Sequence, residues 1–368
     1  MDIGKTQISS RQFVILVAGF IVGSSLLTSF MDDVAKTDAW IVVLLSFAAS
    51  TPFILSYAYL GKRFPGRDLI QINDAVFGPY LGKLVSFLYL LFILYLLLLN
   101  IRTLGNFYVG YIMTETPLIL IMAVVTLTCA YVVKNGIEPL TRLNLFVLVY
   151  ALAVVFISAL LLLGNMDLNH FLPAFTEPPN VYIQSTHIFS AVAFGEVFIF
   201  LMVYPALNGI KKAGKYTMAG YGIATLLLFV ISARNTAVLG PAATISANAT
   251  YEAFKLIDIA GVITRVELLA AVGITVSMFV KICVIYHATV AGVGRLFRMR
   301  STASIIIPVG IVAVIIVANI FSSANLQQLS AEDYHPMIAI PFEFILPPLT
   351  LVVAKIRGLP AKTGGLST

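Results

Sequence analysis

The sequence predicts an all-α integral membrane protein with ten transmembrane helices and both termini in the cytoplasm. Three observations predict it: the composition, a series of apolar segments, and the placement of positive charge between them. Hydrophobic residues make up 60% of the 368 residues and charged residues only 11%, whereas a soluble domain carries about 25% charge. Because lipid offers no partner for free backbone groups, helices are the expected spanning structure.

Positive charge alternates along the chain. Seventeen of the 23 Lys and Arg residues fall in every second gap between apolar segments. These gaps hold Lys5 and Arg11; Lys62, Arg63, Arg67 and Lys83; Lys134 and Arg142; Lys211, Lys212 and Lys215; Arg295, Arg298 and Arg300; and Lys355, Arg357 and Lys362. Cytoplasmic loops retain positive charge, so these gaps are predicted to face the cytoplasm. The net charge of +6 then reflects orientation and anionic lipid headgroups, and it predicts no nucleic acid partner.

The apolar segments set the positions of the spans, since a span needs about 20 apolar residues. We predict spans at 12–31, 39–60, 84–106, 117–134, 143–164, 184–206, 215–234, 263–287, 303–321 and 337–356. The inner loop at 61–83 is expected to carry a short helix at 68–76, and the outer loop at 235–262 another near 251–257. No segment remains for a soluble domain, so residues 1–368 are predicted to form a single transmembrane domain.

Ten spans divide into two halves of five, at about 12–164 and 184–356. Because five is odd, the halves enter the membrane from opposite sides, as in the inverted repeats of many secondary transporters. The first helix of each half carries a disturbance: Gly23, Ser24 and Ser25 in the first span, and Gly195 before Glu196 in the sixth. Glycine permits the backbone to unwind, so both helices are predicted to be broken. In the first span a small-residue packing face is an equal alternative.

Glu196 is the most specific site signal, because nine or more apolar residues flank it on each side. A carboxyl group at that depth costs roughly 2–4 kcal/mol unless it is paired, solvated or protonated. Other spans add Asn100, Arg102, Ser277 and Lys281. Snorkelling to the interface is a competing interpretation for Arg102 and for Lys281.

The tenth span is expected to be a kinked, partly polar segment, because Pro341, Glu343, Pro347 and Pro348 interrupt it. Cys129 and Cys283 lie in apolar segments without CxxC spacing, and the four His residues are scattered. No disulfide, metal or cofactor is predicted. The sequence lacks HExxH, GxSxG and phosphate-loop motifs, which argues against a membrane-embedded enzyme.

An ordered set of short motifs supports a resemblance. It consists of Gly23 to Thr28, Asn100 with Arg102, Thr116-Pro117, Gly195-Glu196, Lys211-Lys212-Ala-Gly-Lys-Tyr, Arg265-Val-Glu267 and Lys281. On these residues the whole chain resembles the spore germination permease family, the B subunits of GerA-type nutrient receptors. That family lies within the amino acid–polyamine–organocation superfamily.

The resemblance implies a LeuT-like fold in the inner membrane of a spore. It also implies an A subunit and a C-subunit lipoprotein as partners, and a small nutrient, often an amino acid, as ligand. The residues expected to bind that ligand are Gly23, Ser24, Ser25, Asn100, Arg102, Phe194, Gly195, Glu196, Ser277 and Lys281. Asn100 is a departure, because some relatives carry a carboxylate there. An ion-coupled amino acid transporter is the alternative function, because a fold does not set function.

Overall fold

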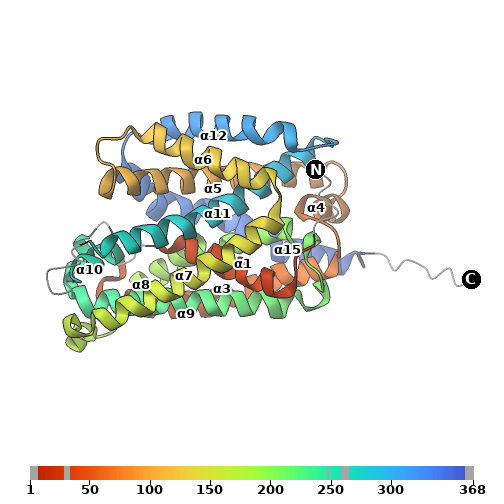
Figure 1. The fold of residues 1–368 in the computed structure, drawn as a ribbon. Helices are drawn as coiled ribbons and strands as arrows, with labels where there is room; N and C mark the ends of the chain where they lie inside the picture. The colour runs from red at the N-terminus through yellow and green to blue at the C-terminus, as the bar shows by residue number, and fades with distance from the viewer. Residues whose placement is uncertain (1–6, 29–33, 247, 258–264, 361–368) are drawn as a thin grey trace, which may run out of the picture.

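The computed structural model describes residues 7–28, 34–246, 248–257 and 265–360. Within these ranges the regular elements are helices (Figure 1), and the one β-bridge joins Ile8 to Leu207. The all-α prediction is therefore confirmed. Residues 29–31 of the first predicted span and 263–264 of the eighth lie outside the described residues. The same holds for Lys5 and Lys362, two of the positive charges in the predicted cytoplasmic gaps.

The helices follow one another with short connections. The first half contains α1 (Ser10–Val22), η1 (Gly23–Ser25), α3 (Ala39–Arg63), α4 (Leu69–Phe77), α5 (Leu81–Tyr111), α6 (Leu118–Lys134) and α7 (Ile137–Leu161). The second half begins with α8 (Pro179–Phe189), η5 (Ser190–Phe194), η6 (Gly195–Met202), α9 (Ala213–Leu239), α10 (Ala249–Lys255) and α11 (Glu267–Leu296). It ends with α12 (Ile306–Ile320), α13 (Ala324–Leu329), η11 (Ser330–Tyr334), α14 (His335–Ala339), η12 (Ile340–Ile345) and α15 (Leu346–Ile356).

Eight helical stretches in the described part are long and apolar enough to cross a membrane. They are Lys36–Arg63, Leu81–Tyr111, Ile137–Leu161, Pro179–Met202, Ile210–Ile245, Glu267–Leu296, Ala303–Ile320 and Ala324–Ile356. Two shorter apolar helices, Ser10–Ser25 and Leu118–Lys134, coincide with the first and fourth predicted spans. The two predicted loop helices are present as α4 and α10. Whether all ten segments span the bilayer stays a prediction.

Helices at corresponding places in the two halves pack against each other. The pairs are α3 with α9, α5 with α11 and α6 with α12, while α1 packs among α7, α9 and α11. Pairwise contact between counterparts is expected where two inverted halves interlock. In Figure 1, α12 and α6 form one flank of the bundle, and α1 lies in its interior. Large apolar side chains are exposed along α6, α7 and α12, which are therefore the faces suited to lipid.

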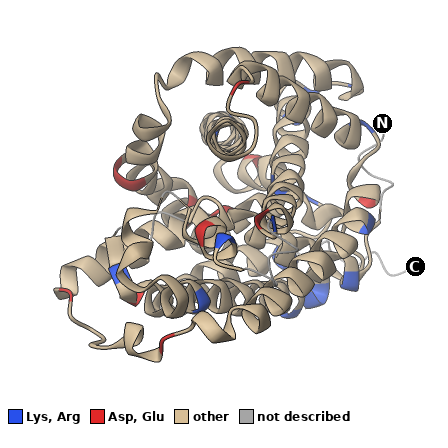
Figure 2. Cartoon of the chain, turned by 60° about the vertical axis from the view of Figure 1, so that its left-hand side comes forward, with Lys and Arg blue, Asp and Glu red and all other residues tan. Residues whose placement is uncertain are grey.

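The positively charged segments gather at one end of the bundle. The described beginning of the chain, α4 and α15 lie at this end, and α10 lies at the other (Figure 1). Most Lys and Arg lie on the side toward the C-terminus, and many Asp and Glu lie away from it (Figure 2). Arg63 Nε donates to the Leu359 carbonyl at 2.6 Å, and Arg295 Nε lies 2.8 Å from Asp68 Oδ2. These contacts tie the basic loops together, and the cytoplasmic orientation of this end stays a prediction.

Candidate functional site

The first helix changes type at Gly23, where the sequence predicted a break. α1 begins with a capping box in which Ser9 and Gln12 bond each other's backbone, and it ends at Val22. The chain continues as one 3₁₀ turn, Gly23–Ser25. A Cβ on Gly23 would lie 2.7 Å from both Lys281 Cβ and the Ser277 carbonyl oxygen. Glycine is therefore required at position 23, because any side chain there would collide with α11.

The sixth helix is irregular over its whole central part. After α8, the chain forms a π-helical turn at Ser190–Phe194 and then a 3₁₀ segment at Gly195–Met202. Such changes alter which carbonyls are bonded within the helix, and they are frequent at functional sites. A Cβ on Gly195 would collide with the carboxyl group of Glu343. The glycine before Glu196 thus admits a second acidic side chain.

Lys281 joins the two irregular helices. Its Nζ donates to Ser24 Oγ at 2.6 Å, to the Val192 carbonyl at 3.4 Å, and lies 3.1 Å from Glu196 Oε2. The last contact has the distance of an ion pair, although its angle is not that of a hydrogen bond. The Lys281 ammonium also lies 5.4 Å from the centre of the Phe20 ring. The exposed fractions of the Lys281 and Glu196 side chains are 0% and 2%, so both charges are fully withdrawn from solvent.

Glu343 is the acidic group that lies against this pair and that the predicted site omitted. It belongs to the π-helical segment η12, where Tyr57 and Tyr89 hydroxyls donate to the backbone carbonyls of Glu343 and Phe342 at 2.6 and 3.1 Å. Its side chain is 0% exposed, and neither carboxyl oxygen has a hydrogen-bond partner among the described residues. Its place in an apolar, proline-rich segment was the available signal, the same one that singled out Glu196.

Aromatic residues of α5 and α14 pack on η12, the segment that carries Glu343. His335 stacks on Phe92, with ring centroids 6.4 Å apart, and Phe92 stacks on Phe342 at 4.6 Å. Asn100 is buried and donates to the Leu96 carbonyl, and its Oδ1 is unpartnered in the described part of the molecule. Phe194 is buried edge-on against Tyr221. Asn100 and Phe194, two of the predicted site residues, are therefore both buried, and only Phe194 belongs to the irregular sixth helix.

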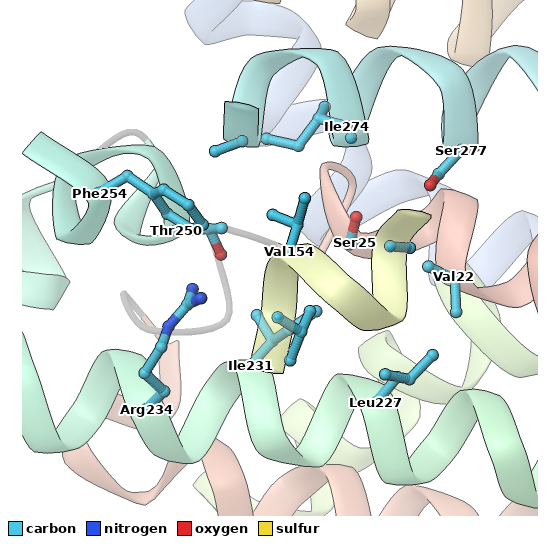
Figure 3. Close-up of a pocket in the computed structure, with 14 residues that line it drawn as sticks. Val22, Ser25, Val154, Leu227, Ile231, Arg234, Thr250, Phe254, Ile274 and Ser277 are labelled. Carbon is cyan, nitrogen blue, oxygen red and sulfur yellow. The ribbon is translucent and has the colours of Figure 1, made fainter. Parts of the chain in front are cut away.

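Two predicted site residues, Ser25 and Ser277, face a separate small cavity. This cavity of about 40 Å³ lies between α1, α7, α9, α10 and α11. Figure 3 shows Arg234 entering it from α9, while Ser25 and Ser277 lie at its opposite end. Arg234 Nη1 donates to Ser158 Oγ at 2.6 Å, and its guanidinium lies 5.1 Å from the centre of the Phe254 ring. The volume suffices for one or two water molecules, which makes it too small for a nutrient.

Arg102 does not join the cluster around Lys281. Its Nη1 and Nη2 donate to the carbonyls of Val317 and Phe321 at 3.3 and 3.1 Å, at the end of α12. Of the ten predicted site residues, the structure brings together Gly23, Ser24, Gly195, Glu196 and Lys281 in direct contact, with Ser277 touching Gly23 through its backbone. No described residues form a group of His, Cys, Asp and Glu that could hold a metal ion.

A larger cavity lies beyond the first-helix break, toward the end of the bundle that holds α10. It has a volume of about 400 Å³, which is in the range of small-molecule sites. Its lining includes Leu26 and Leu27 just after η1, and side chains that are mostly uncharged and polar: Thr103, Asn106, Tyr111, Asn248, Asn325, Gln327 and Gln328. Asn106 Nδ2 donates to Gln327 Oε1 at 2.6 Å, so α5 and α13 are joined across it. The cavity offers hydrogen bonds without a fixed charge.

Comparisons with known proteins agree with this architecture. A family model described as spore germination protein matches residues 7–324. The chain is 26% identical over 355 residues to spore germination protein KB of Bacillus subtilis (strain 168), covering 95% of each. It is 20% identical to spore germination protein YndE of the same organism, covering 96% of this chain and 97% of that protein.

Solved structures of transporters share the fold. Mhp1, a nucleobase-cation-symport-1 family transporter, superposes with a TM-score of 0.65 at 13% identity, covering 96% of this chain and 79% of that chain. MhsT, solved in complex with L-phenylalanine, gives a TM-score of 0.63 at 15% identity, covering 96% and 90%. The LeuT-like fold with irregular first and sixth helices is thereby established. By the match of its family model, the chain belongs to the spore germination protein family.

Proposed function

We propose that the protein is the nutrient-sensing membrane subunit of a spore germinant receptor. It binds a small nutrient, an amino acid in our proposal, between the irregular first and sixth helices, and binding triggers germination. Its partners in this proposal are the A subunit and the C-subunit lipoprotein, in the spore inner membrane. Membership of the spore germination protein family supports the process, and the buried Lys281–Glu196 pair supports the ligand class.

An amino acid is favoured as the ligand because one ammonium and one carboxylate face each other in a site that solvent does not reach. Separating such a pair is costly unless each charge gains a new partner. A zwitterionic amino acid supplies both partners, because its carboxylate can pair with Lys281 while its ammonium pairs with Glu196. The ligand therefore exchanges one internal ion pair for two, which a neutral or singly charged molecule cannot do.

The helix breaks supply further polar groups for the same ligand. Amides near Gly23 to Ser25 suit the carboxylate, and carbonyls near Phe194 and Gly195 suit the ammonium. The 400 Å³ cavity beyond Leu26 and Leu27 is a route of entry that carries no fixed charge. Because the cluster is closed around Lys281, ligand entry requires the first and sixth helices to separate, and this opening is the signal that partner subunits would detect.

Glu343 favours a second candidate function, a proton-coupled amino acid transporter. An ionised carboxylate with no partner in a buried site is far less stable than the neutral acid, so in this candidate function Glu343 is the group that carries the coupled proton. Glu343 lies against Gly195 beside the Lys281–Glu196 pair. A ligand that pairs with Lys281 and Glu196 changes the electrostatic environment of Glu343. Ligand binding would therefore alter the proton affinity of Glu343, as proton coupling requires. Mhp1 shows that the fold occurs in a transporter.

Binding and uptake in liposomes distinguish the two functions. Purified protein is reconstituted and exposed to a panel of labelled amino acids and sugars, with and without an imposed proton gradient. Saturable binding of an amino acid without accumulation supports the receptor subunit. Accumulation that follows the gradient and is abolished in Glu343→Gln supports the transporter instead. Binding of sugars and of no amino acid would overturn the zwitterion argument.

The site itself is tested with Glu196→Gln and Gly23→Ala, each compared with Arg142→Gln. Arg142 is an exposed cation paired with Glu138 on α7, and it is not part of the site. When equal amounts of purified, folded protein are compared, both site variants should lose ligand binding, while the control keeps it. An unchanged half-maximal ligand concentration in both site variants would place the ligand elsewhere.

A further inference from the structure

Among the described residues, no acidic group balances the charge of Arg102. The side chain is 5% exposed, and its two hydrogen bonds go to the carbonyls of Val317 and Phe321. Its Nε has no hydrogen-bond partner, and no carboxylate lies within ion-pair distance of it, among the described residues. Buried charges in proteins are paired as a rule, because removing an ion from water without compensation is expensive. A bound anion would balance this charge.

A groove beside Arg102 has room for that anion. It has a volume of about 530 Å³ and runs between α5, α6 and α12. Arg102, Asn319 and Ser322 line it, together with apolar residues Leu118, Ile119, Met122, Ala318 and Phe321. A groove with a polar end and an apolar wall matches an amphipathic ligand better than a free ion.

The amino end of α6 adds to the positive potential of the groove. α6 begins at Leu118 after Pro117, and no side chain caps its first amides. Free amides at a helix N-terminus favour a bound anion. The helix is held here because Gly105, one turn beyond Arg102, allows Leu118 and Met122 to pack closely on α5. The guanidinium and the helix end therefore face the same groove from two sides.

The groove lies on the lipid side of the bundle, near the end of the hydrocarbon layer. Ile119 on α6 and Ile315 on α12 are 52% and 57% exposed, so the flanking helices present apolar faces outward. α6 and α12 have 17 and 15 residues, which at 1.5 Å per residue gives lengths of about 22–26 Å. A hydrocarbon core is about 30 Å thick. Both helices are therefore slightly shorter than this layer, so their ends, and Arg102 beside them, lie near its edge and within reach of a headgroup phosphate.

We propose that this groove binds the phosphate of an anionic phospholipid in the leaflet on the α10 side. The Arg102 guanidinium and the first amides of α6 hold the phosphate, Asn319 and Ser322 contact the headgroup, and the acyl chains lie along Ile119 and Ala318. Hydrogen bonds to the end of α12 account for two of the Arg102 donor groups. They do not explain the buried charge of Arg102 or the groove beside it. The lipid thereby joins α5, α6 and α12 at a site separate from Lys281.

The test is lipid retention by the full-length protein, measured by native mass spectrometry after exchange into detergent with phosphatidylglycerol or phosphatidylcholine. The wild-type protein should retain one phosphatidylglycerol preferentially. Arg102→Gln removes the charge, while Ala318→Phe fills the groove and leaves the Arg102 hydrogen bonds in place. Each should weaken retention by about tenfold or more, a loss of about 1.4 kcal/mol. Lys134→Gln, which removes an exposed cation from the far end of α6, is the matched control and should retain lipid normally.

Three outcomes would overturn the proposal. Equal retention of the two lipids would show that net lipid charge is not recognised. Normal retention by Ala318→Phe would show that Arg102 only caps α12, even if Arg102→Gln is unstable. Displacement of phosphatidylglycerol by millimolar inorganic phosphate, with phosphate bound in its place, would identify a soluble anion as the ligand.

Discussion

Lys281 on α11 and Glu196 in the sixth helix form an ion pair of 3.1 Å in which neither side chain reaches solvent. The same ammonium donates to Ser24 Oγ at 2.6 Å, so one residue holds the two irregular helices together. In a low-dielectric interior such a pair is sensitive to the loss of either member, because the remaining charge is left buried. The pair is thus the contact that joins the two irregular helices, and in the proposed function it is the group that the ligand displaces.

Removal of one partner should therefore cost more than removal of both. Lys281→Met leaves Glu196 without its cation and should destabilise the protein by about 3–5 kcal/mol. Lys281→Met combined with Glu196→Gln removes both charges and should recover most of that loss. Thermal unfolding in detergent, followed through the fluorescence of the single tryptophan, Trp40, measures the difference.

The double-mutant cycle has a built-in control. Arg142→Gln combined with Glu138→Gln removes an exposed pair on α7, for which the coupling should be about 0–1 kcal/mol. Strict additivity at Lys281 and Glu196 would mean that the two charges do not interact in the folded protein.

The close approach of Gly23 to α11 gives a second prediction. In Gly23→Ala the new methyl group would lie 2.7 Å from the Ser277 carbonyl oxygen and from Lys281 Cβ, and neither is the flexible end of a side chain. We expect a loss of stability of about 1–3 kcal/mol, the usual cost of overpacking. The loss should appear as a lower thermal midpoint in detergent.

Gly222→Ala is the matched control for this substitution. Gly222 lies within α9, and nothing lies within 4 Å of a Cβ built there. Alanine should stabilise the helix by about 1 kcal/mol. If Gly23→Ala is as stable as Gly222→Ala, the first helix does not pack on α11 as the structure has it.

The sequence predicted the architecture well because membrane helices obey strong local rules. Twenty-residue apolar segments and free backbone groups leave few alternatives in lipid, so each predicted span coincides with a helix. Gly23, Gly195 and Glu196 were identifiable for the same reason: small and charged residues are conspicuous in an apolar helix. The candidate site could be assigned to two helices without knowing how they pack, and its role in binding stays a prediction.

Which group pairs with each charged residue depends on tertiary packing, and no local sequence pattern predicts it. Arg102 and Lys281 look alike in the sequence, as single cations inside apolar spans. The structure places Lys281 against Glu196 and Ser24, whereas Arg102 contacts the end of α12, more than 200 residues along the chain. Glu343 reaches the site only because a π-helical turn at Ile340–Ile345 turns it toward Gly195.

The contact between Gly195 and Glu343 predicts a compensating pair of substitutions. Gly195→Ala places a methyl group where the Glu343 carboxyl lies and should destabilise the protein, because this fully buried acid must then change its conformation. Glu343→Ala removes the obstacle, so Gly195→Ala should be tolerated better in that background. Thermal midpoints of the two single variants and the double variant measure the effect.

The outcome depends on the sign of the coupling. The double variant should be more stable than the sum of the single losses allows, by about 1 kcal/mol or more. Glu343→Gln serves as the control, because it keeps the volume of the side chain and should leave Gly195→Ala as destabilising as before. Equal rescue by glutamine and alanine would show that charge, and not space, limits position 195.

The basic end of the bundle gives a prediction outside the membrane-spanning segments. Asp68 caps α4 by accepting from Gln71 N–H at 3.0 Å, and its other oxygen lies 2.8 Å from Arg295 Nε. Asp68→Ala loses the cap and should cost about 1 kcal/mol. Asp68→Asn keeps a capping oxygen, so its loss should be smaller, and the difference between the two variants isolates the cap.

The same residue predicts a pH dependence. Burial raises the pKa of Asp68, and the bonds from Gln71 and Arg295 offset that rise only in part. A carboxyl group with a raised pKa in the folded state ionises more readily when unfolded, so its contribution to stability falls as pH rises from its ordinary pKa of about 3.9 toward the folded value. Relative to Asp68→Asn, the wild-type protein should therefore lose stability between pH 4 and pH 7. A difference in thermal midpoint that is constant over this range, or that changes in the wild type's favour, would show that Arg295 outweighs burial at this site.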